Sequence, residues 1–174
     1  MRIGAGLSTE TDSREAAIEA AMVARRSLDE ARTSLALVFA SPHHAARASA
    51  LLDAVHEACR PEALIGCVGE AVLGGRREVE GEPAVAVWLG ALDEGIETFQ
   101  VEFQATEEAG VFTGWPEEGN RFLLVCDPFT FPADLLLREL DRRQPGVTVI
   151  GGMASGGVET GESRLFLGDR VVSS

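Results

Sequence analysis

The first 68 residues alternate between short apolar runs and longer stretches in which apolar residues recur at helical spacing. The runs Arg2–Leu7, Leu35–Ala40 and Ala63–Val68 have the length of strands, and the second is apolar throughout, as in strands buried on both faces. The two stretches between them predict helices, one starting after Asp12 and one at Pro42. A strand–helix–strand–helix order predicts parallel strands joined by right-handed crossovers.

The middle of the chain has shorter and more polar patterns. The run Pro83–Leu92 is apolar and predicts a further strand, whereas the polar stretch Arg76–Gly81 predicts a turn. Apolar and polar residues alternate over Ile96–Phe103, which is typical of a half-exposed antiparallel strand. The polar, glycine-marked stretch Thr106–Asn120 predicts a mobile loop.

The last third predicts one helix, which begins at Pro132 and ends before Pro145-Gly146. It also predicts four short strands, of which the last two form a closing hairpin. These strands are Phe122–Cys126, Val147–Ile150, Leu165–Leu167 and Arg170–Val172. We therefore expect one domain over residues 1–174, of the α/β class with α+β character. Its mixed sheet begins with parallel βαβ strands, continues with antiparallel hairpins and carries about three helices.

Charge and cysteine content exclude several classes of protein. The net charge is −13, from 28 acidic residues against 15 basic residues that are all arginine, so the chain repels nucleic-acid backbones. Three cysteines without a CxxC pair form neither a disulfide framework nor a zinc site, and we expect no metal or other cofactor. No signal peptide or membrane-length apolar run is present, so we expect a cytoplasmic protein without membrane contact.

The pair Gly66-Cys67 lies at the end of a predicted strand, where open α/β sheets usually bind ligands. Cys67 is a candidate nucleophile only if a base lies beside it, and the histidines His43, His44 and His56 all fall on or next to the second helix. The alternative is that Cys67 packs as a small buried residue. For His43 and His44 we favour a capping or surface role, because adjacent helical side chains diverge and do not share one metal ion easily.

A second candidate region is the glycine-rich segment Gly151–Gly157. Either the backbone amides of this segment form a ligand-binding concavity, or the segment is a plain transition from strand to loop. It matches no phosphate-binding fingerprint. Asp127 follows another predicted strand, and its carboxylate either binds a ligand amine or caps the next turn. We find no set of acid, base and nucleophile in the sequence.

Eight segments in one order together resemble a known family. They are Ile65-Gly66-Cys67, Gly74–Gly81, Pro83–Trp88, Asp127–Pro132, Pro145-Gly146, Ile150–Gly157, Arg164–Leu167 and Asp169–Val172. The chain is identified by them as similar to the FIST domain, a sensory module of signal-transduction proteins. Val68 and Glu70 depart from the small residues that the family commonly has after the glycine–cysteine pair.

The resemblance implies a cytoplasmic sensory domain that binds a small molecule such as an amino acid, without catalysis. It also implies an N-terminal FIST half whose C-terminal FIST half, or another signalling partner, is missing here. We expect the ligand carboxylate to meet backbone amides and the ammonium group to meet the Asp127 carboxylate. The candidate ligand-binding residues are Gly66, Cys67, Gly69, Asp127, Gly151, Gly152, Ser155 and Gly156.

Two alternatives remain open. One is a cysteine-dependent hydrolase or transferase that uses Cys67 and a neighbouring histidine. The other is an acidic interaction scaffold that recruits a partner through Trp115, Phe129 and Phe131.

Overall fold

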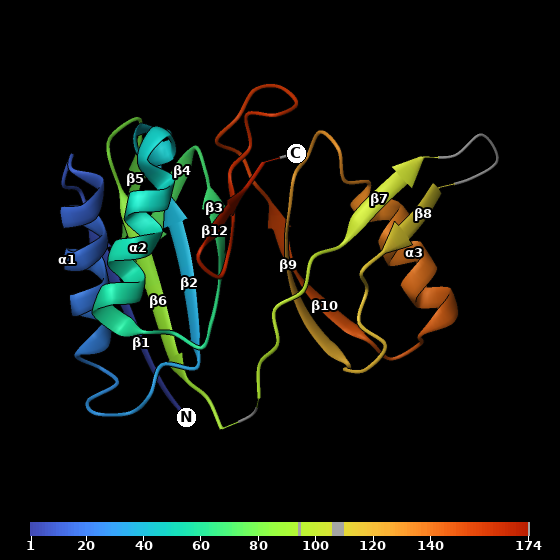
Figure 1. The fold of residues 1–174 in the computed structure, drawn as a ribbon, viewed down its shortest axis with the longest axis horizontal. Helices are drawn as coiled ribbons and strands as arrows, with labels where there is room; N and C mark the ends of the chain where they lie inside the picture. The colour runs from blue at the N-terminus through green and yellow to red at the C-terminus, as the bar shows by residue number, and fades with distance from the viewer. Residues whose placement is uncertain (94, 106–109, 174) are drawn as a thin grey trace. The chain divides into compact units, whose positions relative to one another are not determined.

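The computed structural model of the chain describes residues 1–93, 95–105 and 110–173. It divides into two compact units (Figure 1). The first unit combines Met1–Thr98 with Ala154–Ser174, and the second consists of Phe99–Met153. The described residues contain three α-helices and twelve strands, and they confirm an α+β fold with a mixed sheet.

A six-stranded sheet forms the first unit, in the order β1-β6-β2-β3-β11-β12. Its strands are β1 (Arg2–Ser8), β6 (Val85–Ala91), β2 (Leu35–Ala40), β3 (Ala63–Val68), β11 (Leu165–Leu167) and β12 (Arg170–Val172). Strands β2 and β3 pair in parallel, as predicted, whereas β6 lies between β1 and β2 and is antiparallel to both. The parallel start is therefore confirmed for β2 and β3, but β1 is not a direct neighbour of β2.

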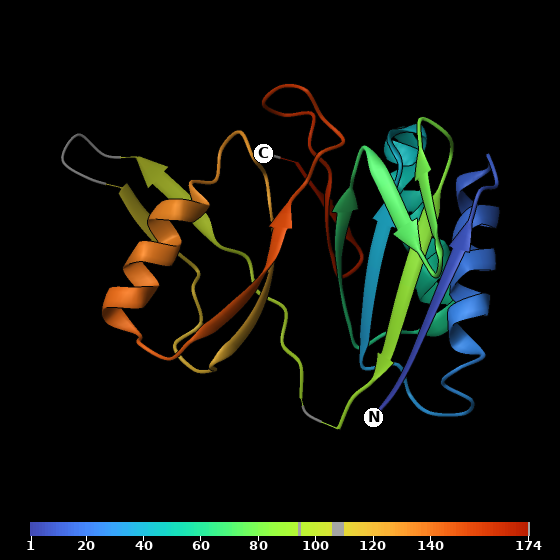
Figure 2. The ribbon, with the colours of Figure 1, turned by 180° about the vertical axis from the view of Figure 1, so that it is seen from behind.

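The helices of the first unit cover one face of this sheet (Figures 1 and 2). They are α1 (Ser13–Arg25), the 3-10 helix η1 (Pro42–Arg47) and α2 (Ala48–Cys59). Asp12 caps α1 as predicted, because its side chain accepts hydrogen bonds from the Arg14 and Glu15 amides at 2.9 and 3.0 Å. The helix predicted from Pro42 begins instead as a 3-10 turn and becomes α-helical at Ala48.

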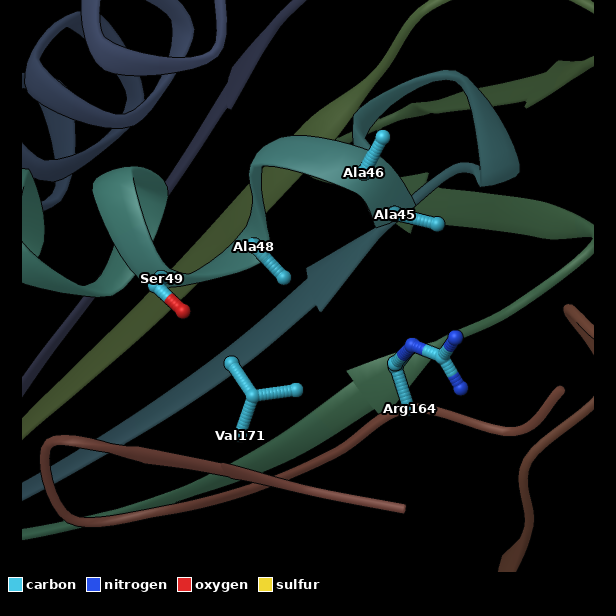
Figure 3. A pocket seen from close by; sticks show the side chains of 6 residues that line it. All are labelled: Ala45, Ala46, Ala48, Ser49, Arg164 and Val171. Carbon is cyan, nitrogen blue, oxygen red and sulfur yellow. The ribbon is translucent and has the colours of Figure 1, made fainter. Parts of the chain in front are cut away.

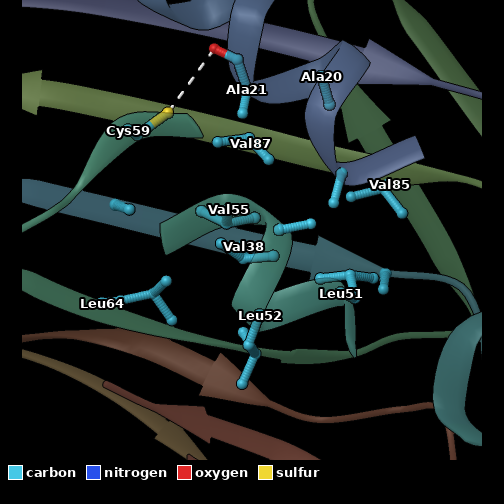
Figure 4. Close-up of a cluster of buried hydrophobic side chains, with 14 of the residues drawn as sticks. Ala20, Ala21, Val38, Leu51, Leu52, Val55, Cys59, Leu64, Val85 and Val87 are labelled. Atoms are coloured by element: carbon cyan, nitrogen blue, oxygen red, sulfur yellow. Dashed lines mark hydrogen bonds between the residues drawn. The ribbon is translucent and has the colours of Figure 1, made fainter. Parts of the chain in front are cut away.

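Glycines in β1 let α1 approach the sheet closely. A Cβ atom on Gly4 would lie 2.0 Å from the Ala24 carbonyl oxygen, and one on Gly6 would lie 2.0 Å from the Ala20 carbonyl oxygen. Between α1, α2 and the sheet lies a core of fully buried alanine, leucine and valine side chains (Figure 4). Small residues therefore give the first unit a thin, dense core.

The opposite face of the sheet is also apolar. The cross-strand neighbours Trp88, Leu37, Ile65 and Leu167 are all half-buried there. One end of this face is covered by a hairpin of β4 (Ala71–Gly74) and β5 (Arg77–Glu80). The turn predicted over residues 76–81 is therefore wrong for residues 77–80, where Val79 is buried while its charged neighbours remain exposed.

The second unit consists of two short sheets and a helix. Its elements are β7 (Glu102–Ala105), β8 (Gly110–Thr113), β9 (Arg121–Cys126), β10 (Thr148–Met153) and α3 (Ala133–Arg143). Strands β7 and β8 are antiparallel, and β9 and β10 are parallel. Aromatic rings pack inside this unit, with Phe99, Trp115 and Phe122 in mutual contact at ring-centroid distances of 4.6 to 5.7 Å.

Three sequence predictions for the second unit need correction. The strand predicted over Ile96–Phe103 starts only at Glu102, because Phe99 packs into the aromatic cluster instead. The loop predicted over Thr106–Asn120 contains β8, and its residues 106–109 lie outside the described residues. The strand predicted to end at Ile150 continues to Met153, because the parallel pairing with β9 extends through Gly151 and Gly152.

Candidate functional site

The carboxyl ends of β2 and β3 lie at one edge of the six-stranded sheet, since Ala40 and Val68 are partners in the parallel register. Residues 154–164 pass this edge and are joined to β3 by backbone hydrogen bonds. The Val68 amide donates to the Arg164 carbonyl at 2.9 Å, and the Gly156 amide donates to the Val68 carbonyl at 3.2 Å. This arrangement is the usual location of a ligand site in sheets with parallel strands.

Three of the predicted site residues, Gly69, Ser155 and Gly156, meet at this edge. The Gly69 amide donates to the Ala40 carbonyl at 2.9 Å, and the Glu70 amide donates to Ser155 Oγ at 3.0 Å. Together with the Gly156 amide, these donors are already satisfied by acceptors within the protein. A ligand carboxylate would reach them only by displacing those acceptors.

Close packing explains why positions 66 and 156 are glycine. A Cβ atom on Gly66 would lie 1.8 Å from the Val38 carbonyl oxygen of β2, and one on Gly156 would lie 2.3 Å from Val68 Cγ1. Neither position has room for a side chain, so glycine is needed at both for the fold itself.

Cys67 is buried in β3 with only 6% of its surface exposed. Burial raises the pKa of its thiol to about 11, so the sulfur is protonated at neutral pH. Within the described part of the chain, no hydrogen bond joins Cys67 to a histidine. The geometry favours Cys67 as a packed core residue.

The histidines have different environments. His44 is fully buried, and its Nδ1 lies 2.9 Å from the Ser13 hydroxyl oxygen, so the capping or surface role predicted for it is wrong. Burial, and then the neighbouring His43, lower the pKa of His44. Its Nε2 has no hydrogen-bond partner among the described residues. His43 is exposed, as predicted.

Three predicted site residues, Asp127, Gly151 and Gly152, belong to the second unit. Asp127 follows β9, is 3% exposed, and accepts a hydrogen bond from Thr130 Oγ1 at 2.5 Å. Its carbonyl also accepts from the Phe131 amide at 3.1 Å, so Asp127 caps the turn after β9. Gly151 has a φ of 149° and contacts Leu124 too closely for a Cβ atom, whereas Gly152 has open space around it.

The aromatic residues predicted for an interaction scaffold are mostly internal to the second unit. Trp115 contacts Phe122, and its Nε1 donates to Gln144 Oε1 at 3.2 Å, while Phe131 packs against Phe112 at 5.6 Å between ring centroids. Phe129 is 42% exposed and is the one member of the predicted trio that presents its ring to solvent.

A pocket of about 480 Å³ opens in the first unit beside η1 and the first turn of α2 (Figure 3). Its lining consists of Ala45, Ala46, Ala48, Ser49, Arg164 and Val171. Arg164 Nη1 donates to the Gly161 carbonyl at 2.7 Å and to the Ser163 carbonyl at 3.1 Å, which fixes the guanidinium. Sequence reasoning missed this pocket, although Arg164 opens one of the segments that carry the family resemblance and precedes the closing hairpin.

None of the helices in the described residues has both the length and the apolar character needed to cross a bilayer. The residues that the structure describes contain no cluster of three or more histidine, cysteine or carboxylate side chains arranged to hold a metal ion.

Comparison with known proteins shows one family and several relatives. Residues 34–174 match the FIST N domain. The uncharacterized protein Rv0628c of Mycobacterium tuberculosis is 44% identical, and the uncharacterized protein Mb0898c of Mycobacterium bovis is 42% identical, each over 177 residues. Each alignment covers all of this chain and 46% of the relative. The chain therefore spans about half the length of these curated relatives. No solved structure matches.

Proposed function

The chain belongs to the family of FIST N domains, and from this membership we propose that it binds a small molecule as the input of a sensory or signal-transduction protein. The observation that carries the proposal is the pocket at η1 and α2, because it opens at the carboxyl ends of the parallel strands β2 and β3. A ligand bound there would contact Arg164 of the segment 154–164, which is joined to the end of β3 by backbone hydrogen bonds.

We propose an amino acid as the ligand class. The test is a thermal-shift screen of the chain against a panel of amino acids, in which at least one member is expected to raise the melting temperature. Ser49→Trp fills the pocket from its rim and is expected to abolish the shift. Asp53→Trp, one turn further along α2 and exposed outside the pocket, is the matched control and is expected to retain it. A flat response to the whole panel would contradict the proposal.

We further propose that binding is not coupled to catalysis. The raised pKa of the Cys67 thiol supports this, because a protonated and buried sulfur is a poor nucleophile at neutral pH. Cys67→Ala is expected to bind ligand as the wild type does, and the Cys67 thiol is expected to react with iodoacetamide more slowly than free cysteine. Fast alkylation of Cys67 would favour the hydrolase or transferase alternative.

A cytoplasmic location and a protein partner are also proposals. Three buried cysteines without a disulfide support a reducing compartment. The relatives extend well beyond the matched region, which supports a companion region, such as a C-terminal FIST half, that receives the signal. Co-purification of the remainder of the Mycobacterium tuberculosis relative with the region of it that matches this chain would test for such a partner.

A further inference from the structure

The guanidinium of Arg164 is held in place on one side and open on the other. Its Nη1 donates to two backbone carbonyls, those of Gly161 and Ser163. Its Nε and Nη2 donate to none of the described residues, and no carboxylate of those residues forms an ion pair with it. The Nε–Nη2 edge of an arginine matches the two oxygens of one carboxylate, so a fixed guanidinium with this edge open is arranged for bidentate binding.

Apart from Arg164, the side chains that line the pocket are small, and most of them are apolar. Alanine side chains and Val171 supply aliphatic surface, and the Ser49 hydroxyl is the second polar side chain of the lining (Figure 3). The lining has no acidic side chain, although the chain as a whole carries a net charge of −13. A ligand ammonium group would therefore find no counter-charge in this pocket, whereas a carboxylate would find Arg164.

We propose that this pocket binds a small aliphatic carboxylate through Arg164, with the aliphatic chain against Val171 and the alanines. The proposal rests on the proposed function and names the ligand class of the same pocket. It makes the α-amino group of an amino acid dispensable for binding. A simple carboxylate of the same carbon skeleton is thus expected to bind at least as tightly as the amino acid.

Titration calorimetry with butyrate, L-2-aminobutyrate and the neutral butyramide tests this on the unmodified chain. Butyrate is expected to bind at least about tenfold more tightly than butyramide, because only the carboxylate forms charge-assisted hydrogen bonds with the guanidinium. Inorganic phosphate is the comparison anion and is expected to bind more weakly than butyrate, since it has no aliphatic part to lie on Val171.

Arg164→Gln is expected to lower butyrate affinity by at least about tenfold, and Arg164→Lys by less, because lysine retains the charge without the fork. Arg170→Gln removes one positive charge at the exposed first residue of strand β12, outside the pocket lining, and is the matched control. We expect it to change the affinity by no more than about twofold. The ligand series on the wild type does not depend on any variant folding.

The results separate this proposal from the proposed function. Equal binding of butyrate and butyramide, tighter binding of phosphate, or full affinity in a folded Arg164→Gln protein would each overturn the carboxylate proposal. If butyrate fails while an amino acid still gives a shift that Ser49→Trp abolishes, the ligand class is wrong and the sensory function stands. If neither binds, both proposals fail.

Discussion

The first unit buries aliphatic side chains between helices and a six-stranded sheet, whereas the second, which has two short sheets, packs aromatic rings against one another. Alanine and glycine let the elements of the first unit approach until backbone atoms nearly touch, as at Gly66 and Val38. Fewer residues are fully buried in the second unit, and Phe122 retains 8% exposure. Close backbone packing and large rings are therefore two different sources of stability in one chain.

The largest expected effect tests the close packing of the first unit. Gly66→Ala places a methyl group 1.8 Å from the Val38 carbonyl oxygen, so it must force β2 and β3 apart. We expect it to lower the free energy of unfolding by at least about 3 kcal/mol, measured by urea denaturation. Gly152→Ala, in the open surroundings of β10, is the control and is expected to cost less than about 1 kcal/mol. Similar losses in the two variants would contradict the comparison.

The next prediction compares the two cores directly, using the tryptophan that each unit contains. Leu51→Ala is expected to cost about 3 kcal/mol in the transition reported by Trp88, because Leu51 is fully buried in the aliphatic core. Phe122→Ala removes a ring that contacts both Phe99 and Trp115, and it is expected to act mainly on the transition reported by Trp115.

Fluorescence of the single-tryptophan backgrounds Trp88→Phe and Trp115→Phe separates these transitions. If either core substitution shifts the unfolding transitions of both tryptophans equally, the two units unfold as one. Their two cores would then not be separate sources of stability.

A smaller effect is expected from pH, and it concerns the first unit. Burial lowers the pKa of His44 from its ordinary value of 6.5, so the folded state favours the neutral ring. The corresponding stability is present above pH 6.5 and is lost as the pH falls from there through the lower pKa of the folded state. Two neighbouring titratable groups also act on the pKa of His44: His43 lowers it further, and Asp12 raises it.

Denaturation of the first unit, followed by Trp88 between neutral and mildly acidic pH, measures this loss. His44→Gln is expected to flatten the pH dependence, and His43→Gln, at the exposed neighbour, is expected to leave most of it. An unchanged slope in a folded His44→Gln protein would show that another group carries the effect.

The smallest expected effect concerns the turn after β9 in the second unit. Thr130→Ala removes the hydroxyl that donates to the buried Asp127 carboxylate and is expected to cost about 1 kcal/mol in the Trp115 transition. Thr130→Ser keeps the hydroxyl and is expected to recover most of that loss. If serine is as destabilising as alanine, the methyl group rather than the hydrogen bond is responsible.

Sequence patterns predicted the first unit better than the second for a physical reason. Strands β2 and β3 were predicted with their observed bounds because their apolar runs are continuous. Strands β7 and β8 of the second unit have no fully buried residue, and β5 of the first unit has one, so their patterns resemble those of turns and loops. Phe99 fits the alternation of a strand but packs its ring with Trp115, a contact that no local pattern contains.

The candidate site was predictable in part. Glycine content drew attention to the end of β3 and to residues 151–157, and the structure brings Gly69, Ser155 and Gly156 together. Some backbone amides at that edge already donate hydrogen bonds within the protein. Their acceptors, such as Ala40 and Ser155, are distant in sequence, so the sequence did not reveal these bonds. Arg164 gave no signal by itself, because one arginine among 15 basic residues is usually a solvated surface charge.

By itself, the sequence determined the strands of the six-stranded sheet, the cap at Asp12 and the family, because periodicity, capping and motif order are properties of neighbouring residues. Only the tertiary structure decided that β6 lies between β1 and β2, that His44 is buried, and that Arg164 faces a pocket beside α2. These features arise from contacts between segments far apart in the chain. Their free energies depend on burial and distance, which residue order alone does not specify.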